Sequence, residues 1–398
     1  MKLNQWTLGL AAVGAVSLVS AVRADEAKVS QVQTALSSTT LSGYVDVAAQ
    51  YNAGNNSVGS TIAPGVSTSK IDSFSLNDID IALDKPQDES PWASGYHVEL
   101  NTGTDSIQPL GGATSSVGVR QAYVVVRTPV GNGIDWKMGL FDNIVGYEGN
   151  TDGANPNYTR SYGYSVEPTS YLGLLGTYKV NSVITVQGGI ANTLTSQNGG
   201  VPITSTSAKS YIGSVAFTAP DSWGWAKGAT LNLGVNVQNS GNYKNDANFV
   251  TVTPPATNPN GYANAQQNYT ADLVIPTPLA ALKVGFAFDY VTYANAYTAA
   301  VNSKEDSVWI TGAYATYQAT DKLSLNLRGE YDKDDVGGNQ GEEITATVQY
   351  NLWANVISRA EFRWDHIAHG TGFGVQDING NYATSSAYLA AVNLIYQF

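Results

Sequence analysis

The feature that most constrains this chain is an alternation of apolar and polar residues that runs from residue 39 to the C-terminus. In residues 41–51 apolar side chains occupy every second position, and polar ones such as Asp46 and Gln50 fall between them. The same pattern recurs in residues 231–237, 282–290 and 356–365. A period of two residues is the signal of β-strands whose two faces meet different surroundings. The chain is therefore predicted to be an all-β protein.

Turn residues divide this region into sixteen predicted strands. They are expected at residues 39–51, 72–85, 95–101, 117–127, 133–141, 171–180, 183–192, 208–218, 229–237, 268–276, 282–291, 308–317, 323–331, 342–350, 356–365 and 386–398. The alternation changes phase between Leu76 and Ile79, which predicts a β-bulge in the second strand. A soluble β-sandwich would also alternate, so the strands alone do not decide the fold.

The lengths of the connections separate the two folds. Short turns, such as Asn181-Ser182, alternate with long connections, which are expected at 52–71, 102–116, 142–170, 193–207, 238–267, 292–307, 332–341 and 366–385. Outer-membrane barrels have long extracellular loops, short periplasmic turns and an even number of strands. A sandwich has no reason to sort its loops in this way. The sequence therefore predicts a transmembrane, antiparallel, up-and-down β-barrel over residues 39–398, with both ends on the periplasmic side.

Composition agrees with a wall between lipid and water. Charged residues make up 13% of the chain, about half of the usual quarter. Cysteine is absent, which excludes a disulfide framework and a thiolate metal site. The net charge is −12, and removal of the basic residues Lys2 and Arg23 leaves 18 basic against 32 acidic residues, or −14. Such a chain repels nucleic acid, and acidic groups that line a lumen favour cations.

The two ends of the chain carry targeting features. Residues 1–24 combine a basic start, an apolar run and a small-residue cleavage pattern, which predicts a signal peptide removed on secretion. Residues 25–38 do not alternate and are expected to form a periplasmic or lumenal segment. The last strand keeps one register up to the terminal Phe398, like the signal that outer-membrane barrels present to their assembly machinery. The expected location is the bacterial outer membrane, with the lipid bilayer and lipopolysaccharide as surroundings.

Several segments, taken in order, resemble a known family. They are residues 78–86, 99–105, 120–124, 139–141, 146–148 and 157–164. They are similar to the OmpL-like family of outer-membrane β-barrel porins, closely from residue 41 to about residue 193 and mainly by pattern thereafter. The resemblance implies an outer-membrane porin without a cofactor. Analogy with general porins adds a homotrimer as a candidate assembly.

The third long connection, residues 142–170, is the candidate pore constriction. In general porins the corresponding loop folds into the lumen and narrows it, and charged groups there select ions by Coulomb attraction. The candidate residues are Asp142, Glu148, Asp152, Arg160 and Glu167. The alternative is an external loop that carries charged side chains.

Alternation also turns charged residues of the predicted strands toward the lumen. An Arg or Lys that faced lipid at the centre of the bilayer would cost about 2–4 kcal/mol, so the inward orientation is favoured. The candidate pore-lining residues are Arg120, Asp135, Lys137, Arg328, Glu330, Arg359, Glu361 and Arg363. The alternative is that the Arg–carboxylate pairs are struts that rigidify the wall.

These residues predict a passive diffusion channel for small hydrophilic solutes and ions that weakly prefers cations. One alternative is a carbohydrate-selective porin, because Tyr147, Tyr158, Tyr162, Tyr164 and Tyr171 could stack on sugars. Another is a non-conducting barrel with an adhesive or structural role. No catalytic motif is present, and His366 and His369 form an isolated pair in a loop, so neither an enzyme nor a metal site is predicted.

Overall fold

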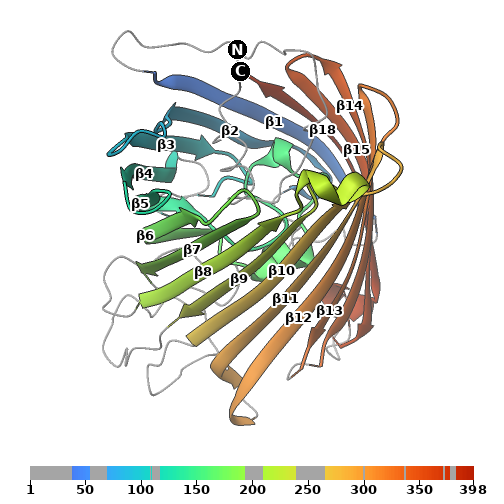
Figure 1. Ribbon diagram of the computed structural model, residues 1–398. Coiled ribbons are helices and arrows are strands. Elements are labelled where there is room, and N and C mark those ends of the chain that lie inside the picture. The colour runs from blue at the N-terminus through green and yellow to red at the C-terminus, as the bar shows by residue number, and fades with distance from the viewer. Residues whose placement is uncertain are drawn as a thin grey trace.

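The computed structural model confirms a closed β-barrel (Figure 1). It describes residues 38–53, 70–107, 109, 117–192, 209–238, 265–298, 301–335, 338–370, 373–376 and 382–398. The predicted signal peptide and all but residue 38 of the predicted segment 25–38 lie outside these residues. Within the described residues, no helix has the length and apolar character needed to span a membrane.

Sixteen strands form the barrel wall, as the connection pattern predicted. They are β1 (Thr40–Ala53), β2 (Ser73–Lys85), β3 (Ser94–Thr102), β4 (Gly118–Thr128), β5 (Ile134–Asp142), β6 (Ser170–Lys179), β7 (Ile184–Asn192), β8 (Lys209–Thr218), β9 (Thr230–Gln238), β10 (Ala265–Pro276), β11 (Leu282–Thr298), β12 (Val301–Gln318), β13 (Leu323–Asp334), β14 (Gln340–Trp353), β15 (Val356–His369) and β18 (Ser386–Gln397). The other elements of the described residues are η2 (Asp152–Ala154), α2 (Tyr162–Val166), η3 (Asp221–Ala226) and the hairpin β16 (Phe373–Gln376) and β17 (Tyr382–Thr384).

Every barrel strand pairs antiparallel with its neighbours, and β1 closes the sheet on β18. The seam ends with two backbone hydrogen bonds between Gly43 and Phe398, of 3.1 and 3.0 Å. Closure leaves no sheet edge, so the wall strands can pair their backbone groups without water. The end with Phe398 is the end with the short turns (Figure 1), and it is therefore the periplasmic end.

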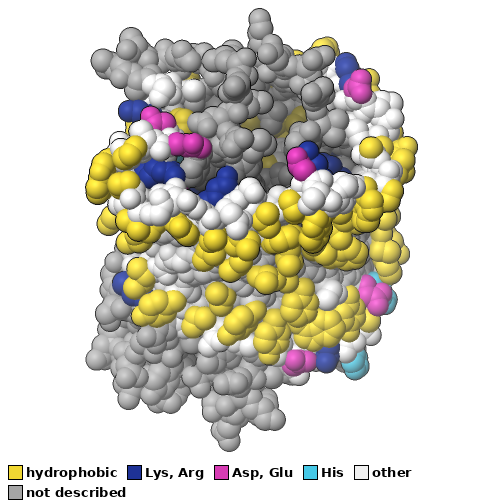
Figure 2. Space-filling model, in the orientation of Figure 1, with side chains coloured by type: hydrophobic (Ala, Val, Ile, Leu, Met, Phe, Trp, Pro, Cys, Tyr) yellow, Lys and Arg dark blue, Asp and Glu magenta, His cyan; other side chains and the backbone are white. Residues whose placement is uncertain are grey.

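The two faces of the wall match the predicted parity. Leu233 and Phe362 point outward and are about half exposed, at 47% and 52%, whereas Asn232 and Arg363 point inward and are buried. Figure 2 shows hydrophobic side chains over the outer wall, with charged side chains near the two rims. An apolar outer face and a polar lumen are the arrangement that a barrel in lipid requires.

Two β-bulges re-aim side chains of β2 and β4. In β2 the register shifts so that Asp46 faces Asp78 while Val47 faces Leu76, which leaves Asn77 as an extra residue where the phase change predicted a bulge. In β4 the register with β3 shifts beside Arg120. Arg120 and its neighbour Gln121 can therefore both contact Glu99 on the lumen side.

Some predicted connections were wrong in detail. Most of the predicted loop 292–307 is strand, because β11 and β12 continue to Thr298 and Val301. The predicted connection 366–385 contains the β16–β17 hairpin, and η3 occupies the turn between β8 and β9. At the extracellular ends of β11 and β12, polar residues do not alternate with apolar ones, so the sequence pattern ends before the strands do.

The parity of the wall gives a first testable prediction. Phe362→Arg places a charge on the lipid-facing side of β15 and is expected to destabilise the folded barrel by about 2–4 kcal/mol. Phe362→Leu keeps an apolar side chain there and is the matched control. Urea unfolding in lipid vesicles measures both, and equal stabilities for the two variants would contradict the outward orientation of Phe362.

Candidate pore constriction

The segment between β5 and β6, residues 143–169, folds into the barrel and is called loop 3 below (Figure 1). It contains η2 and α2, and its residues contact strands on the far side of the barrel, from β9 round to β15 and β18. The predicted inward fold of the third extracellular loop is confirmed. An external loop with the same charges would not make these contacts.

Arginines of the wall bind the backbone carbonyls of loop 3. Arg359 Nη1 donates to three of them, those of Asp152, Asn155 and Asn157, at 3.0–3.2 Å. Arg363 Nη1 donates to the carbonyl of Arg160 at 2.7 Å. A loop buried away from water must pair its carbonyl groups, and these guanidinium groups supply the donors that a strand or helix would otherwise provide.

Carboxylates of the same wall accept from the backbone N–H groups of loop 3. Glu361 accepts from Tyr158 and Thr159 at 2.5 and 2.9 Å. Glu330 accepts from Tyr162 and Gly163, at 2.7 and 3.3 Å, at the start of α2. Alternating Arg and Glu on β13 and β15 thus forms a docking surface that is complementary to both polar groups of the loop backbone.

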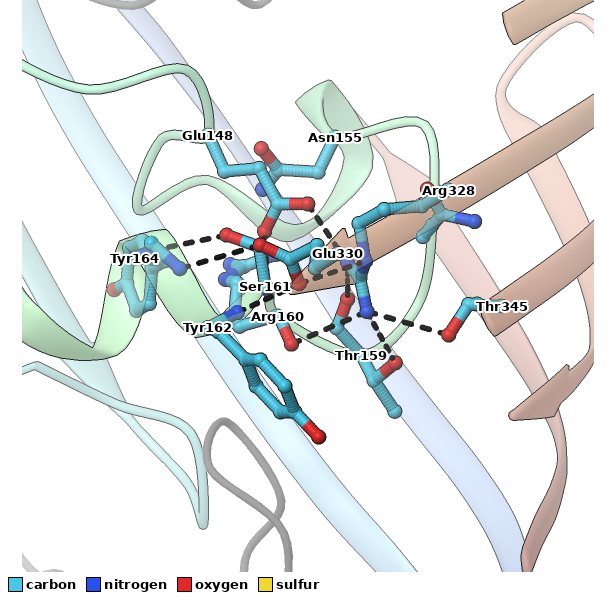
Figure 3. A network of polar contacts seen from close by, with 12 residues as sticks. Glu148, Asn155, Thr159, Arg160, Ser161, Tyr162, Tyr164, Arg328, Glu330 and Thr345 are labelled. Atoms are coloured by element: carbon cyan, nitrogen blue, oxygen red, sulfur yellow. Dashed lines mark hydrogen bonds and ion pairs between the residues drawn. The ribbon is translucent and has the colours of Figure 1, made fainter. Parts of the chain in front are cut away.

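Arg328 is the centre of this docking surface (Figure 3). Its guanidinium lies 2.8 Å from a carboxylate oxygen of Glu148 on loop 3 and 3.0 and 3.5 Å from those of Glu343 and Glu330 on the wall. It also donates to the Thr159 carbonyl at 2.7 Å. All four charged side chains are buried, and three carboxylates surround one cation.

A second arginine holds the beginning of loop 3. Arg120 pairs with Glu99 on β3 and lies 2.8 Å from Asp142 and 3.7 Å from Asp80. It reaches Thr151 of loop 3 at 3.4 Å. The bulge in β4 turns this guanidinium inward, and again three carboxylates share one arginine.

Apolar contacts fix the rest of the loop. Ile144 and Val145 pack with Phe141 and with side chains of β6, β7 and β8. Tyr147 stacks on Tyr314 of β12, with ring centroids 3.9 Å apart. A Cβ at Gly234 would overlap Val145, and one at Gly285 would overlap Tyr147, so inward glycines in β9 and β11 leave room for these two side chains.

The structure brings together most of the predicted constriction residues. Asp142 joins Arg120, Glu148 joins Arg328, and Arg160 pairs with Asp152 at 2.7 Å. Glu167 instead faces carboxyl groups of β10 and β11, chiefly Asp289.

The predicted wall residues divide into two groups. Arg120, Arg328, Glu330, Arg359, Glu361 and Arg363 face inward and bind loop 3 or its charged neighbours. Asp135 instead pairs with Arg127 at 3.1 Å near the periplasmic turn between β4 and β5. Lys137 lies 4.5 Å from the Tyr123 ring.

The tyrosines considered for sugar stacking are largely covered. Tyr162 and Tyr171 are fully buried, Tyr158 is buried beside Lys70, whose ammonium lies 4.7 Å from its ring, and Tyr147 is stacked on the wall. Tyr147 and Tyr164 remain partly exposed.

Sequence reasoning missed four participants. Asp272, Asp289 and the glycines at 234 and 285 were not linked to loop 3. The available signal was a glycine or carboxylate at an inward position of β9, β10 or β11. Among the described residues, no group of three or more His, Cys, Asp or Glu side chains is arranged to hold a metal ion.

A closed sixteen-strand barrel with a polar lumen and an inward third loop defines the class of outer-membrane porins. The sequence matches the model of the family "Putative beta-barrel porin-2, OmpL-like" over residues 38–398. The chain therefore belongs to the OmpL-like porins, which are channels and not enzymes.

Solved porin structures share the fold at low sequence identity. The outer-membrane channel DcaP of Acinetobacter baumannii is 11% identical, with a TM-score of 0.61 over 90% of this chain and 97% of its own. The anion-selective porin from Comamonas acidovorans is 12% identical, with a TM-score of 0.57 over 90% and 99%. OmpT of Vibrio cholerae, solved in a trimer form, is 11% identical, with a TM-score of 0.53 over 90% and 99%. No curated protein matches the sequence significantly.

Proposed function

We propose that this porin is a passive diffusion channel for small hydrophilic solutes and ions, narrowed by loop 3 and weakly selective for cations. A sixteen-strand barrel is wide enough to hold an aqueous channel. Polar groups in the lumen can hydrogen-bond a solute that would lose its hydration shell in the bilayer. Loop 3 crosses this lumen and therefore sets the width of any path through it.

Cation preference follows from the composition of the two arginine clusters. Arg328 is surrounded by Glu148, Glu330 and Glu343, and Arg120 by Asp80, Glu99 and Asp142. With every carboxyl group ionised, each cluster carries an excess of two negative charges. A confined negative potential raises the local concentration of cations and lowers that of anions.

The test is the reversal potential of the purified protein in a planar bilayer between KCl solutions that differ about tenfold in concentration. A potential whose sign reports potassium as the more permeant ion is expected. A preference for the anion, of the kind that the name of the anion-selective Comamonas porin states for that protein, would overturn the cation proposal. A barrel that passes no current would favour the structural or adhesive role, and block of the current by added sugars would favour a carbohydrate channel.

A homotrimer is part of the same proposal, supported by the shared fold with OmpT, which has been solved as a trimer. The mass of the detergent-solubilised protein, measured by light scattering, tests the assembly, and a monomer mass would contradict it.

A further inference from the structure

Three buried carboxyl groups meet where the end of loop 3 reaches the barrel wall. Glu167 directly follows α2, while Asp272 and Asp289 point inward from the neighbouring strands β10 and β11. Each side chain is at most 2% exposed. None of the three belongs to the arginine docking surface on β13 and β15.

One contact in the cluster joins two acids. A Cβ at Gly163 would lie 2.5 Å from Oδ2 of Asp289 and 3.8 Å from Oε1 of Glu167, so both carboxyl groups border the same point of α2, and the two acids share a hydrogen-bonding contact. Two ionised carboxylates have no hydrogen to share, so this contact needs a proton on one of them. Paired acids in other proteins hold one proton between them for the same reason.

Within the part of the chain that the structure describes, acidic groups dominate the surroundings of this cluster. The charged groups with the largest effect on Glu167 are Asp289, Asp272 and Glu148, all acidic. The tyrosine facing it from β6 is Tyr171, a neutral phenol. This is the opposite of the situation at Glu148, where Arg328 supplies a positive charge at 2.8 Å.

Few donors reach the cluster. The side-chain amide of Asn143 donates to Glu167 at 3.5 Å, and both carboxylate oxygens of Asp272 are buried without a hydrogen-bond partner among the described residues. A proton shared between Glu167 and Asp289 satisfies the contact between them without a further donor.

The backbone of loop 3 is built for close approach to these acids. Gly146 has a φ of +95°, and a Cβ there would overlap the Glu167 carboxylate. A Cβ at Gly163, in α2, would lie 2.5 Å from a carboxylate oxygen of Asp289. Glycine at both positions lets α2 and the start of loop 3 rest directly on the carboxyl pair.

We propose that Glu167 and Asp289 form a proton-dependent latch that holds the end of loop 3 against β10 and β11, so that the channel conducts more at alkaline than at acid pH. The proposal rests on the proposed porin function. When the shared proton leaves, two adjacent carboxylates in a poorly hydrated space repel each other, and water must enter to solvate them. The end of loop 3 then separates from the wall, and the path beside it widens.

The direction of the pH dependence follows from the sign of the shift. Burial, and then the neighbouring Asp289, raise the pKa of Glu167 well above its ordinary value. A group whose pKa is raised in the latched state stabilises that state when protonated. The latch is therefore formed at low pH and is lost as the pH rises through the raised pKa.

The experiment measures single-channel conductance from about pH 5 to about pH 9, a range in which a raised carboxyl pKa titrates and an ordinary one does not. The wild type is expected to conduct about twofold or more at the alkaline end relative to the acid end. Asp289→Asn and Glu167→Gln each supply an amide that can donate to the remaining carboxylate at every pH. Both variants are expected to show a low conductance without pH dependence.

Glu89→Gln is the matched control, because Glu89 is exposed in the periplasmic turn between β2 and β3. It should keep the wild-type pH profile. Circular dichroism verifies the barrel of each variant, and the two substitutions test the latch independently if one of them fails to fold. A wild type that conducts equally across the range, or an Asp289→Asn variant with the wild-type profile, overturns the latch and leaves the porin function intact. Absence of current from every variant at every pH overturns the porin function, and the latch with it.

Discussion

Replacing Arg328 with alanine is expected to cost about 3–5 kcal/mol of folding free energy and to release loop 3 from the wall. The substitution removes the guanidinium at the centre of the docking surface and leaves Glu148, Glu330 and Glu343 buried without their nearest counterion. It also leaves the Thr159 carbonyl without the donor at 2.7 Å. The loss of the nearest counterion and the loss of this donor both penalise the docked loop.

The expected readouts are a lower midpoint in urea unfolding and faster proteolytic cleavage within loop 3. Lys227→Ala is the control, since Lys227 and Asp221 form an exposed pair in the β8–β9 turn, at 61% and 85% exposure. Such surface pairs contribute less than about 1 kcal/mol. Arg328→Ala and Lys227→Ala variants of equal stability and equal protease resistance would show that Arg328 does not hold the loop.

A partner substitution separates charge from packing. Glu148→Gln removes one of the three carboxylates, so Arg328→Ala should be less damaging in the Glu148→Gln background than in the wild type. Strictly additive effects of the two changes would mean that Arg328 and Glu148 do not interact across the lumen.

The barrel could be predicted from sequence because the same physical constraint applies to every strand. Each wall residue meets either lipid or the lumen, and this choice alternates along all sixteen strands, so one pattern is confirmed sixteen times. Even the bulge at Asn77 leaves a trace, since an extra residue inverts the alternation after it. The alternation fades at the extracellular ends of β11 and β12, and there the predicted strands were too short.

The candidate site could be predicted only in part, because parity says which way a side chain points and not what it meets. Arg328, Arg359 and Arg363 point inward as predicted, yet their donors bind the carbonyls of loop 3. Whether an inward guanidinium meets water or another segment depends on how that segment folds. The residues of loop 3 do not alternate regularly between apolar and polar. Neither the path of the loop nor its contact with Asp272 and Asp289 could therefore be deduced from the sequence pattern.

Inward glycines of the wall indicate where another segment approaches it. A glycine at an inward position of a strand weakens that strand and is retained only where something must approach closely. Gly234 and Gly285 lie on two strands of one wall, and both accommodate consecutive parts of loop 3. Inward glycines on β9 and β11, the two strands that flank β10, therefore mark the part of the wall that loop 3 contacts.

Replacing residues 144–166 with a short Gly-Ser linker is expected to raise single-channel conductance by about threefold or more, the largest change predicted for this protein. The conductance of a water-filled pore scales with its narrowest cross-section, and loop 3 is the segment that crosses the lumen and contacts the opposite wall. The arginines left behind would be solvated by lumen water, so the barrel itself should persist. The same linker in place of residues 221–227 changes only the periplasmic turn that contains η3 and should leave conductance unaltered. An equal conductance for the wild type and the loop 3 variant would mean that the narrowest point lies elsewhere, and that loop 3 does not govern permeation.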